Sequence, residues 1–223
     1  MKGVVLAGGQ GTRLHPLTKV SNKHLLPVYD RPMIDYPIQT LKDMGCDDII
    51  IVSGGEHIGG IAEYLGGGYT YRVQDSASGI AGALACAEGL VDGIFPVILG
   101  DNYFSEAPDY HGKPTLYLKD APDPSRFGVY HEGVIVEKPS DPPSRDVVTG
   151  LYVFDLGVFD FIRTLKPSAR NELEITDVNN WYLRNDCLVV NYHGVWLDMG
   201  TFDSLLIATT YIGSSKLNES ELE

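Results

Sequence analysis

The sequence predicts an α/β fold, a doubly wound and mainly parallel sheet with a small antiparallel lobe in the second half of the chain. In the first hundred residues, short runs rich in β-branched residues alternate with segments of helical periodicity, which is typical of βαβ units. After that, the apolar runs lie closer together and are separated by the proline-rich turns PDPS and PSDPPS, which favours antiparallel pairing. On a parallel sheet, ligands bind beyond the carboxyl ends of the strands.

The expected strands are short runs of β-branched and other apolar residues, bounded by glycine, proline or aspartate. The first is KGVVLAG, which starts at Lys2 and opens the parallel part of the sheet. The full set is expected at residues 2–8, 47–54, 95–101, 115–120, 134–138, 148–155 and 187–198.

Helices are expected between these strands. Residues 33–44 place Ile34, Ile38 and Leu41 on one face, with Met44 beside them, and Gly45 follows as a C-cap. This is the pattern of a crossover helix. Three further helices are expected at residues 79–91, 173–185 and 201–212, and we expect the polar tail GSSKLNESELE to be frayed.

The composition indicates one folded domain. The chain has 223 residues, of which 43% are hydrophobic, and no internal repeat or long linker divides it, so we expect a single domain over residues 1–223. A formal net charge of -13 argues against nucleic acid or an anionic membrane as a partner, because both require a broad basic face. Neither a signal peptide nor a membrane span is apparent, and we expect a cytoplasmic protein.

The cysteines and histidines suggest no metal centre. Cys46, Cys86 and Cys187 are widely spaced and form no CxxC pair, so we expect buried free thiols rather than disulfides or a zinc site. The six histidines show no metal-ligand spacing.

A glycine-rich segment, LAGGQGTRLHPLTK, follows the first strand at residues 6–19. Residues 1–29 contain four lysines or arginines and no acidic residue, in a chain that is acidic overall. Two familiar phosphate-binding loops are excluded by spacing. The P-loop requires Lys-Ser or Lys-Thr after its last glycine, and the dinucleotide fingerprint requires a glycine at Leu14.

This segment nevertheless has the chemistry of an anion site. Glycines allow backbone N–H groups to approach an anion closely. Arg13 can hold two phosphate oxygens at once, and Lys23 can act as a mobile point charge, with Lys19 a further cation nearby. A turn that requires glycine for structural reasons alone is the alternative, and the cations without any acid make it less favoured.

The string LAGGQGTRLHPLTKVSNKHLLPVYDRPMIDYPI resembles the signature of sugar-1-phosphate nucleotidylyltransferases. The similarity continues through LGDN, EKP, VTGLYVFD, NELEITDVN and WLDMGTFDSL, and so covers nearly the whole chain. Within that family the motifs are most similar to the glucose-1-phosphate thymidylyltransferases. The resemblance implies a Rossmann-like, glycosyltransferase-A-like sheet. Residues 1–110 would mainly bind the nucleotide, and the antiparallel lobe in residues 111–223 would mainly bind the sugar phosphate.

The resemblance implies a reaction between two anions. A phosphate oxygen of a sugar-1-phosphate, with glucose-1-phosphate expected, attacks the α-phosphorus of dTTP or UTP, and pyrophosphate and a dTDP-sugar (or UDP-sugar) are the products. Such a reaction needs in-line positioning and charge neutralisation rather than a protein nucleophile. Mg²⁺ is the implied cofactor, and a homo-oligomer is compatible with the resemblance.

The site residues follow by matching the family's motifs. The catalytic residues are expected to be Arg13, Lys23 and Lys138. The expected nucleotide-binding residues are Leu6, Gly8, Gly9, Gly11, Thr12, Arg13, Lys23, Gln74, Gly79 and Asp101. The expected sugar-binding residues are Asn102, Gly128, Glu137, Lys138 and Val148.

Asp101 and Asp198 are the expected metal ligands. Each follows an apolar run, FPVIL and VWL, so that a carboxylate lies at the carboxyl edge of a strand. Mg²⁺ prefers carboxylate and phosphate oxygens and keeps several waters, so one or two aspartates suffice. Taken alone, an aspartate after a strand is more often a turn former, and only the match to the family's metal positions favours a ligand. The Gln74 amide can pair with a pyrimidine edge, which favours dTTP or UTP over purine nucleotides.

Three alternatives differ in plausibility. A UTP-using or other-sugar enzyme of the same family is close to the main prediction. A catalytically silent regulatory subunit is disfavoured because the proposed catalytic and metal-binding residues occur together, and a nicotinamide-dependent oxidoreductase is excluded at Leu14. Similar proteins usually continue beyond the helix after WLD, so we also expect a short form that retains catalysis but lacks the feedback control that depends on this extension.

Overall fold

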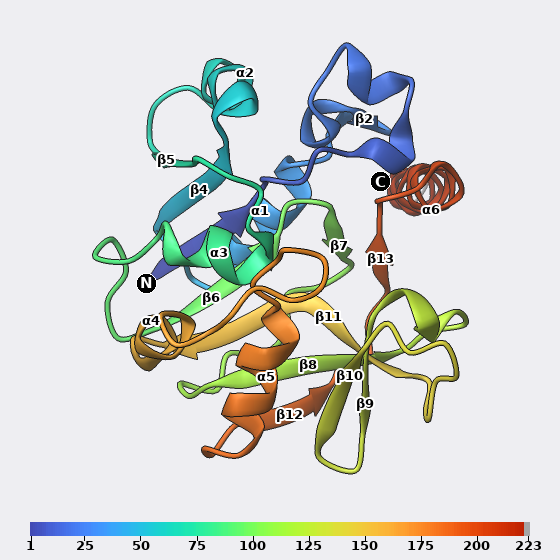
Figure 1. Cartoon of the computed structure of the whole chain (residues 1–223). Helices are drawn as coiled ribbons and strands as arrows, with labels where there is room; N and C mark the ends of the chain where they lie inside the picture. Colours follow the sequence, from blue (N-terminus) through green and yellow to red (C-terminus); the bar gives the residue numbers. More distant parts are fainter. Residues whose placement is uncertain (221–223) are drawn as a thin grey trace.

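A single nine-stranded sheet runs through the molecule, with the strand order β10-β9-β11-β6-β1-β4-β5 and with β8 and β12 branching from β11 (Figure 1). The computed structural model describes residues 1–220. The predicted α/β class is confirmed, because a parallel half and a largely antiparallel half share this sheet.

The parallel half contains β1 (Lys2–Leu6), β4 (Asp48–Gly54), β5 (Thr70–Gln74) and β6 (Ile94–Leu99). Strand β1 is central and pairs in parallel with β4 on one side and β6 on the other. Its side chains alternate between the two faces, and both faces are buried, which explains why the run is apolar throughout. The carboxyl ends of these strands therefore meet at one edge.

The second half is built on β11 (Asp146–Asp155), which pairs antiparallel with β6, β8 and β9. Strands β8 (Thr115–Asp120), β9 (Gly128–His131) and β10 (Val134–Glu137) complete the antiparallel part, while β12 (Leu188–Asn191) runs parallel to β8.

The prediction of one strand over residues 187–198 is wrong. Strand β12 ends at Asn191, and β13 (Trp196–Asp198) pairs instead with β7 (Asn102–Phe104) in a separate two-stranded sheet. The turn between them is fixed by Lys119, whose ammonium donates to the carbonyls of residues 192, 193 and 194. This turn redirects the chain towards the carboxyl edge of the parallel strands.

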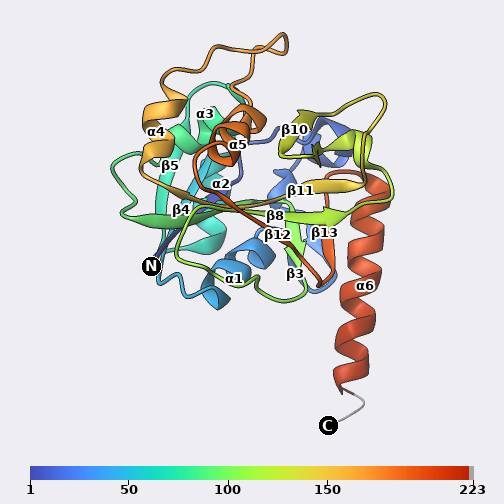
Figure 2. The same ribbon diagram turned by 90° about the horizontal axis from the view of Figure 1, so that it is seen from below.

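Helices cover both faces of the sheet (Figure 2). Helix α1 (Asp35–Asp43) and α2 (Gly55–Leu65) pack on one face, and α3 (Gly79–Ala85), α4 (Gly157–Ile162) and α5 (Ile175–Leu183) on the other. The predicted apolar face of residues 33–44 is confirmed, since Ile34, Ile38, Leu41 and Met44 are buried. The predicted helix at 79–91 is shorter than expected, and α2, α4 and β5 were not predicted.

The last helix, α6 (Phe202–Ser220), begins where the sequence predicts but continues beyond residue 212 (Figure 2). Its inner face packs Ala208 and Ile212 against Val28 and Met33, and Lys216 pairs with Asp30. The prediction of a frayed tail is therefore wrong for residues 213–220, while its last part, residues 221–223, lies outside the described residues. Among the helices of residues 1–220, none has the length and hydrophobicity needed to cross a membrane.

The three cysteines are free thiols, as predicted. Only Cys46 is buried, whereas Cys86 and Cys187 are half-buried, so the prediction of burial holds for one of the three.

The segment between β1 and α1 forms three short 3-10 helices, Thr12–Leu14, Leu17–Lys19 and Lys23–Leu25. The third is capped by Asn22, whose side-chain oxygen accepts from the backbone N–H of His24 at 2.7 Å and lies 2.9 Å from His24 Nδ1. An amide oxygen can only accept hydrogen bonds, so the ring nitrogen must be the donor in the second contact. The proton of the neutral imidazole is therefore on Nδ1. Burial, with a smaller contribution from the Lys23 charge, lowers the pKa of His24 to about 3.

His24 should make the fold less stable in acid. Its pKa is lower in the folded chain than in the unfolded one, so the unfolded state binds the extra proton first, and stability is lost as the pH falls below about 6.5. We expect His24→Gln to remove this dependence. The stability of the wild type relative to the variant should fall by about 2 kcal/mol between pH 8 and pH 5.

Urea unfolding at the two pH values measures this difference, and the exposed His193→Gln serves as the matched control. Parallel pH profiles for the wild type and His24→Gln would contradict a buried neutral His24.

Candidate active site

A cavity of about 710 Å³ opens at the carboxyl edge of the parallel strands. Its walls come from the glycine-rich segment, from the segments after β5 and β6, from the antiparallel lobe and from the start of α5. The structure brings every residue expected at the site to this cavity, namely Leu6, Gly8, Gly9, Gly11, Thr12, Arg13, Lys23, Gln74, Gly79, Asp101, Asn102, Gly128, Glu137, Lys138, Val148 and Asp198. Lys19, the further cation near the loop, does not line the cavity and is exposed.

The glycine-rich segment requires glycine for two local reasons. Gly11 has a φ of 65°, in the left-handed region that side chains disfavour. A Cβ on Gly9 would lie 3.0 Å from the Lys23 ammonium, so this loop closes directly over the lysine side chain. The Thr18 hydroxyl donates to the Gly11 carbonyl at 2.7 Å and holds the turn.

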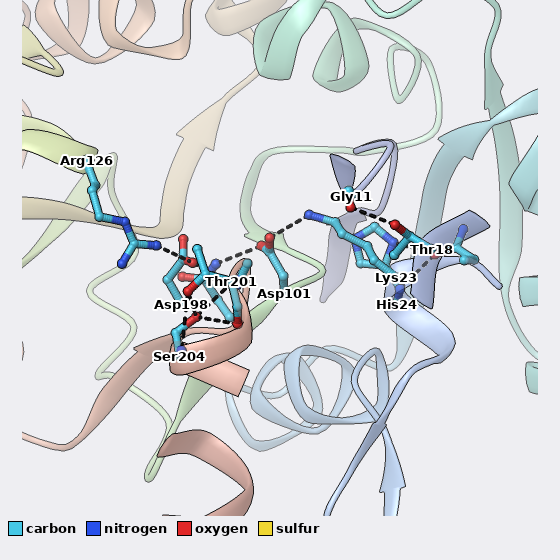
Figure 3. Close-up of polar contacts among 12 residues, drawn as sticks. Gly11, Thr18, Lys23, His24, Asp101, Arg126, Asp198, Thr201 and Ser204 are labelled. Carbon is cyan, nitrogen blue, oxygen red and sulfur yellow. Dashed lines mark hydrogen bonds and ion pairs between the residues drawn. The ribbon is translucent and has the colours of Figure 1, made fainter. Parts of the chain in front are cut away.

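Two carboxylates face the same part of the cavity (Figure 3). Asp101 lies two residues beyond β6, and Asp198 is the last residue of β13. The β13–β7 register places Asp198 opposite Asn102, and the N–H of Met199 donates to the Asp101 carbonyl at 2.8 Å. Residues almost a hundred positions apart are thus joined by backbone pairing, which sequence spacing does not reveal.

Each carboxylate has a cationic partner from the chain. Lys23 Nζ donates to Asp101 Oδ2 at 2.6 Å, and both side chains are only about a tenth exposed. Arg126 Nη2 lies 3.4 Å from Asp198 Oδ1. On the Asp198 side, the Arg13 guanidinium is close to Gly200, where a Cβ would lie 2.9 Å from Arg13 Nη2.

These partners have different effects on the two acids. Burial opposes ionisation of Asp101, yet the Lys23 charge and hydrogen bond keep its pKa below the usual range. Burial and the nearby Asp101 charge raise the pKa of Asp198, and the Gly200 N–H and the two arginines only partly offset this rise. The ionisation of Asp198 therefore depends on the charge of Asp101.

The donor set suits a hard divalent cation. No group of three or more His, Cys, Asp or Glu side chains in residues 1–220 could hold a metal ion, so a cation here would rely on Asp101 and Asp198. Two carboxylates suffice for Mg²⁺ when substrate phosphates and waters supply the remaining ligands. The residues therefore fit the implied cofactor.

A second group of charges lines the antiparallel lobe. Glu137 accepts from Thr176 at 2.6 Å and from Arg170 at 3.1 Å, and Lys138 Nζ lies 3.0 Å from it. Burial opposes ionisation of Glu137, but the Thr176 hydrogen bond and the Lys138 charge lower its pKa. Lys138 has a φ of 43°, an uncommon conformation for a non-glycine residue that is held by its backbone bond to Phe127.

Sequence reasoning missed several polar residues of the cavity. The main ones are Arg126, Tyr152, Arg170 and Thr176. A signal existed for Arg170 and Thr176, which lie just before and inside the motif NELEITDVN. Arg126 lies in a proline-rich turn, and only the fold brings it to Asp198.

Gln74 ends β5 and lies against the glycine-rich segment. Its Nε2 donates to the Gly79 carbonyl at 3.2 Å and to the Ser78 hydroxyl at 3.3 Å. A Cβ on Gly8 would lie 2.6 Å from Gln74 Oε1, so the absence of a side chain there lets the amide and the loop come together.

Comparison with known proteins shows which family the chain belongs to. A family model described as nucleotidyl transferase matches residues 2–215. A glucose-1-phosphate thymidylyltransferase of Neisseria gonorrhoeae is 40% identical over 238 residues, covering 95% of this chain and 82% of that protein. One from Mycolicibacterium smegmatis is 37% identical and covers 98% of this chain and 84% of its own length.

Solved structures share the fold of this chain. The crystal structure of a candidate glucose-1-phosphate thymidylyltransferase from Bacillus anthracis, in complex with sucrose, superposes with a TM-score of 0.87 at 45% identity, covering 95% of this chain and 94% of that one. A UDP-glucose pyrophosphorylase complexed with UDP-glucose has a TM-score of 0.84 at 23% identity, covering 96% and 98%, and shows the fold alone. The extent of the match to the family model and to these relatives shows that the chain belongs to the nucleotidyl transferase family.

Proposed function

We propose that the chain transfers the nucleotidyl group of dTTP to a sugar-1-phosphate, with glucose-1-phosphate as the sugar, and releases pyrophosphate. The observation that carries this proposal is the distribution of charge in one cavity. A carboxylate pair with basic partners lies beside the glycine-rich segment, and a separate Glu-Lys-Arg cluster lies on the antiparallel lobe. The names of the relatives at about 40% identity support the same activity.

The reaction requires two anions to meet in line. A phosphate oxygen of the sugar-1-phosphate forms a bond to the α-phosphorus, while the bond between that phosphorus and the bridging oxygen of the β-phosphate breaks and the electron pair leaves with pyrophosphate. Arg13 and Lys23 would neutralise the triphosphate, and Lys138 and Arg170 would hold the attacking phosphate. This assignment uses positioning and charge and no protein nucleophile.

Asp101 and Asp198 would hold Mg²⁺. The bound cation would supply further neutralisation of phosphate charge. The chain's own part is to present two oxygen donors at a fixed separation, which the β13–β7 pairing and the Gly200 N–H to Asp198 bond at 2.9 Å support.

The two halves of the chain would divide the substrates between them. Residues 1–110 contribute the glycine-rich segment and Gln74 for the nucleotide, and residues 111–223 contribute Gly128, Glu137 and Lys138 for the sugar phosphate. Glu137 is already bonded and ionised, so it can accept hydrogen bonds from sugar hydroxyls. The division is not strict, because the pairing of β13 with β7 places Asp198 of the second half opposite Asn102 of the first half.

The activity is tested by measuring pyrophosphate release with dTTP, UTP, ATP and GTP against several sugar-1-phosphates in the presence of magnesium. Sugar-dependent release with dTTP is the expected result, and no release with any pair would overturn the proposal.

We expect Asp101→Asn and Asp198→Asn each to reduce turnover by roughly 10² or more at ordinary magnesium, because each removes a carboxylate from the expected cation site. The exposed Asp141→Asn is the matched control and should leave turnover unchanged. Steady-state kinetics with dTTP and glucose-1-phosphate provides the measurement, and near-normal rates in both variants would exclude the two-aspartate site.

Arg13→Lys keeps the charge but loses the planar pair of donors, so we expect a large fall in kcat. The control is Arg184→Lys at the exposed residue that follows α5. If Arg13→Lys and the wild type had the same kcat and KM, a bidentate grip on phosphate oxygens would be the wrong description.

The pocket beside Gln74 should select pyrimidine nucleotides. We expect dTTP and UTP to support turnover and ATP and GTP to do so poorly, as measured by kcat/KM for each nucleotide. The preference between dTTP and UTP should be weaker, since one methyl group in an apolar pocket contributes only about 1 to 3 kcal/mol. Equal kcat/KM for dTTP and GTP would contradict this assignment of Gln74.

A further inference from the structure

Lys23 is expected to contact phosphate, but in this structure its ammonium binds a carboxylate. Its side chain passes beneath the glycine-rich segment, where a Cβ on Gly11 would lie 2.9 Å from Lys23 Cβ. The ammonium then reaches Asp101 Oδ2 at 2.6 Å, and this carboxylate is its ion-pair partner (Figure 3). One of the two oxygen donors suited to a divalent cation is therefore already bound by a cation of the chain.

This contact is not a loose surface pair. The side chains of Lys23 and Asp101 are 11% and 10% exposed. A buried carboxylate that loses its partner is strongly destabilised, so Asp101 must have a cation beside it at every stage of a reaction cycle. Lys23 in turn must have an anion if it leaves Asp101.

The neighbouring histidine offers no substitute. His24 is buried, lies next in sequence and is within electrostatic reach of Asp101, but burial and the Lys23 charge keep its pKa near 3. It is therefore neutral at ordinary pH. The positive charge that balances Asp101 comes from Lys23.

The same arrangement, in weaker form, occurs at the other carboxylate. Arg126 lies 3.4 Å from Asp198, in a longer and more exposed contact than that of Lys23 with Asp101. Two acids expected to bind one cation thus each have a basic residue in place, and the tighter of the two contacts is that of Lys23.

We propose that Lys23 is an internal competitor of the divalent cation for Asp101, so that the metal binds well only when a triphosphate draws the Lys23 ammonium away. This inference rests on the proposed function, because it takes Asp101 and Asp198 as the metal ligands. The triphosphate supplies the anionic oxygens that an ammonium requires, and Lys23 has rotatable bonds that let it move between the two partners. Lys23 would thus control when Asp101 can bind the metal, in addition to contacting phosphate.

The test measures Mn²⁺ binding to the full chain without nucleotide, by electron paramagnetic resonance, in the wild type, Lys23→Met and Lys23→Gln. Both variants remove the charge, and each replacement side chain is only slightly shorter than lysine. Two different uncharged side chains are used so that the result does not depend on one variant folding. We expect both to bind Mn²⁺ at least about tenfold more tightly than the wild type, since a unit charge next to the site is removed.

Two further variants make the result specific. Adding Asp101→Asn to Lys23→Met should abolish the gain. Lys216→Met removes the lysine of another Lys-Asp pair, which Lys216 of α6 forms with Asp30, and should leave Mn²⁺ binding as weak as in the wild type. Circular dichroism confirms that each variant is folded.

Equal Mn²⁺ affinity for the wild type and the folded Lys23 variants would overturn the inference, as would tight binding by the wild type alone. A gain that persists in the double variant would also overturn it. These failures are distinguishable from failure of the proposed function, which is measured separately as sugar-dependent pyrophosphate release by the wild type.

Discussion

The organisation of this site depends on one electrostatic constraint, the placement of two carboxylates, the buried Asp101 and the half-buried Asp198, in the same cleft. Asp101 and Asp198 are brought together by the pairing of β13 with β7, and burial together with the Asp101 charge raises the pKa of Asp198. Such a pair is stable only with positive charge beside it. The chain supplies that charge from segments far apart in the sequence, Lys23 before α1 and Arg126 before β9, so the glycine-rich segment and the antiparallel lobe are both tied to this centre.

The same principle extends along the cavity. On the lobe side, Glu137 is surrounded by Lys138, Arg170 and Thr176, which keep it ionised and fixed in position. Charges of both signs thus lie in contact within the cavity, and many of the cations are held by acids rather than by solvent. Binding of two phosphate-bearing substrates would exchange these internal partners for phosphate oxygens.

Much of the fold could be predicted from the sequence because its causes are local. The runs IIIV and VVL are apolar throughout because both faces of the parallel strands are covered. The apolar residues of 33–44 recur at helical spacing because one face of this helix packs against the sheet. Helix α2 was missed because its sequence, GEHIGGIAEYL, contains glycines that weaken the helical signal. The division of residues 187–198 into two strands, and the extension of α6 to Ser220, depend on tertiary contacts of Lys119 and Lys216.

The candidate site, like the fold, has a part that could be predicted from the sequence and a part that depends on tertiary contacts. Motif similarity predicted which residues line the cavity, while the roles assigned to them stay predictions. The pairings of Lys23 with Asp101 and of Arg126 with Asp198 could not be read from the sequence, since they join positions separated by 78 and 72 residues.

The most direct measurement follows the phosphorus itself, with dTTP labelled at either the α or the γ position and incubated with the chain, glucose-1-phosphate and magnesium. The account predicts that the α label appears in the sugar nucleotide and the γ label in pyrophosphate. Retention of both labels in dTTP, or release of the γ label as free phosphate, would contradict it.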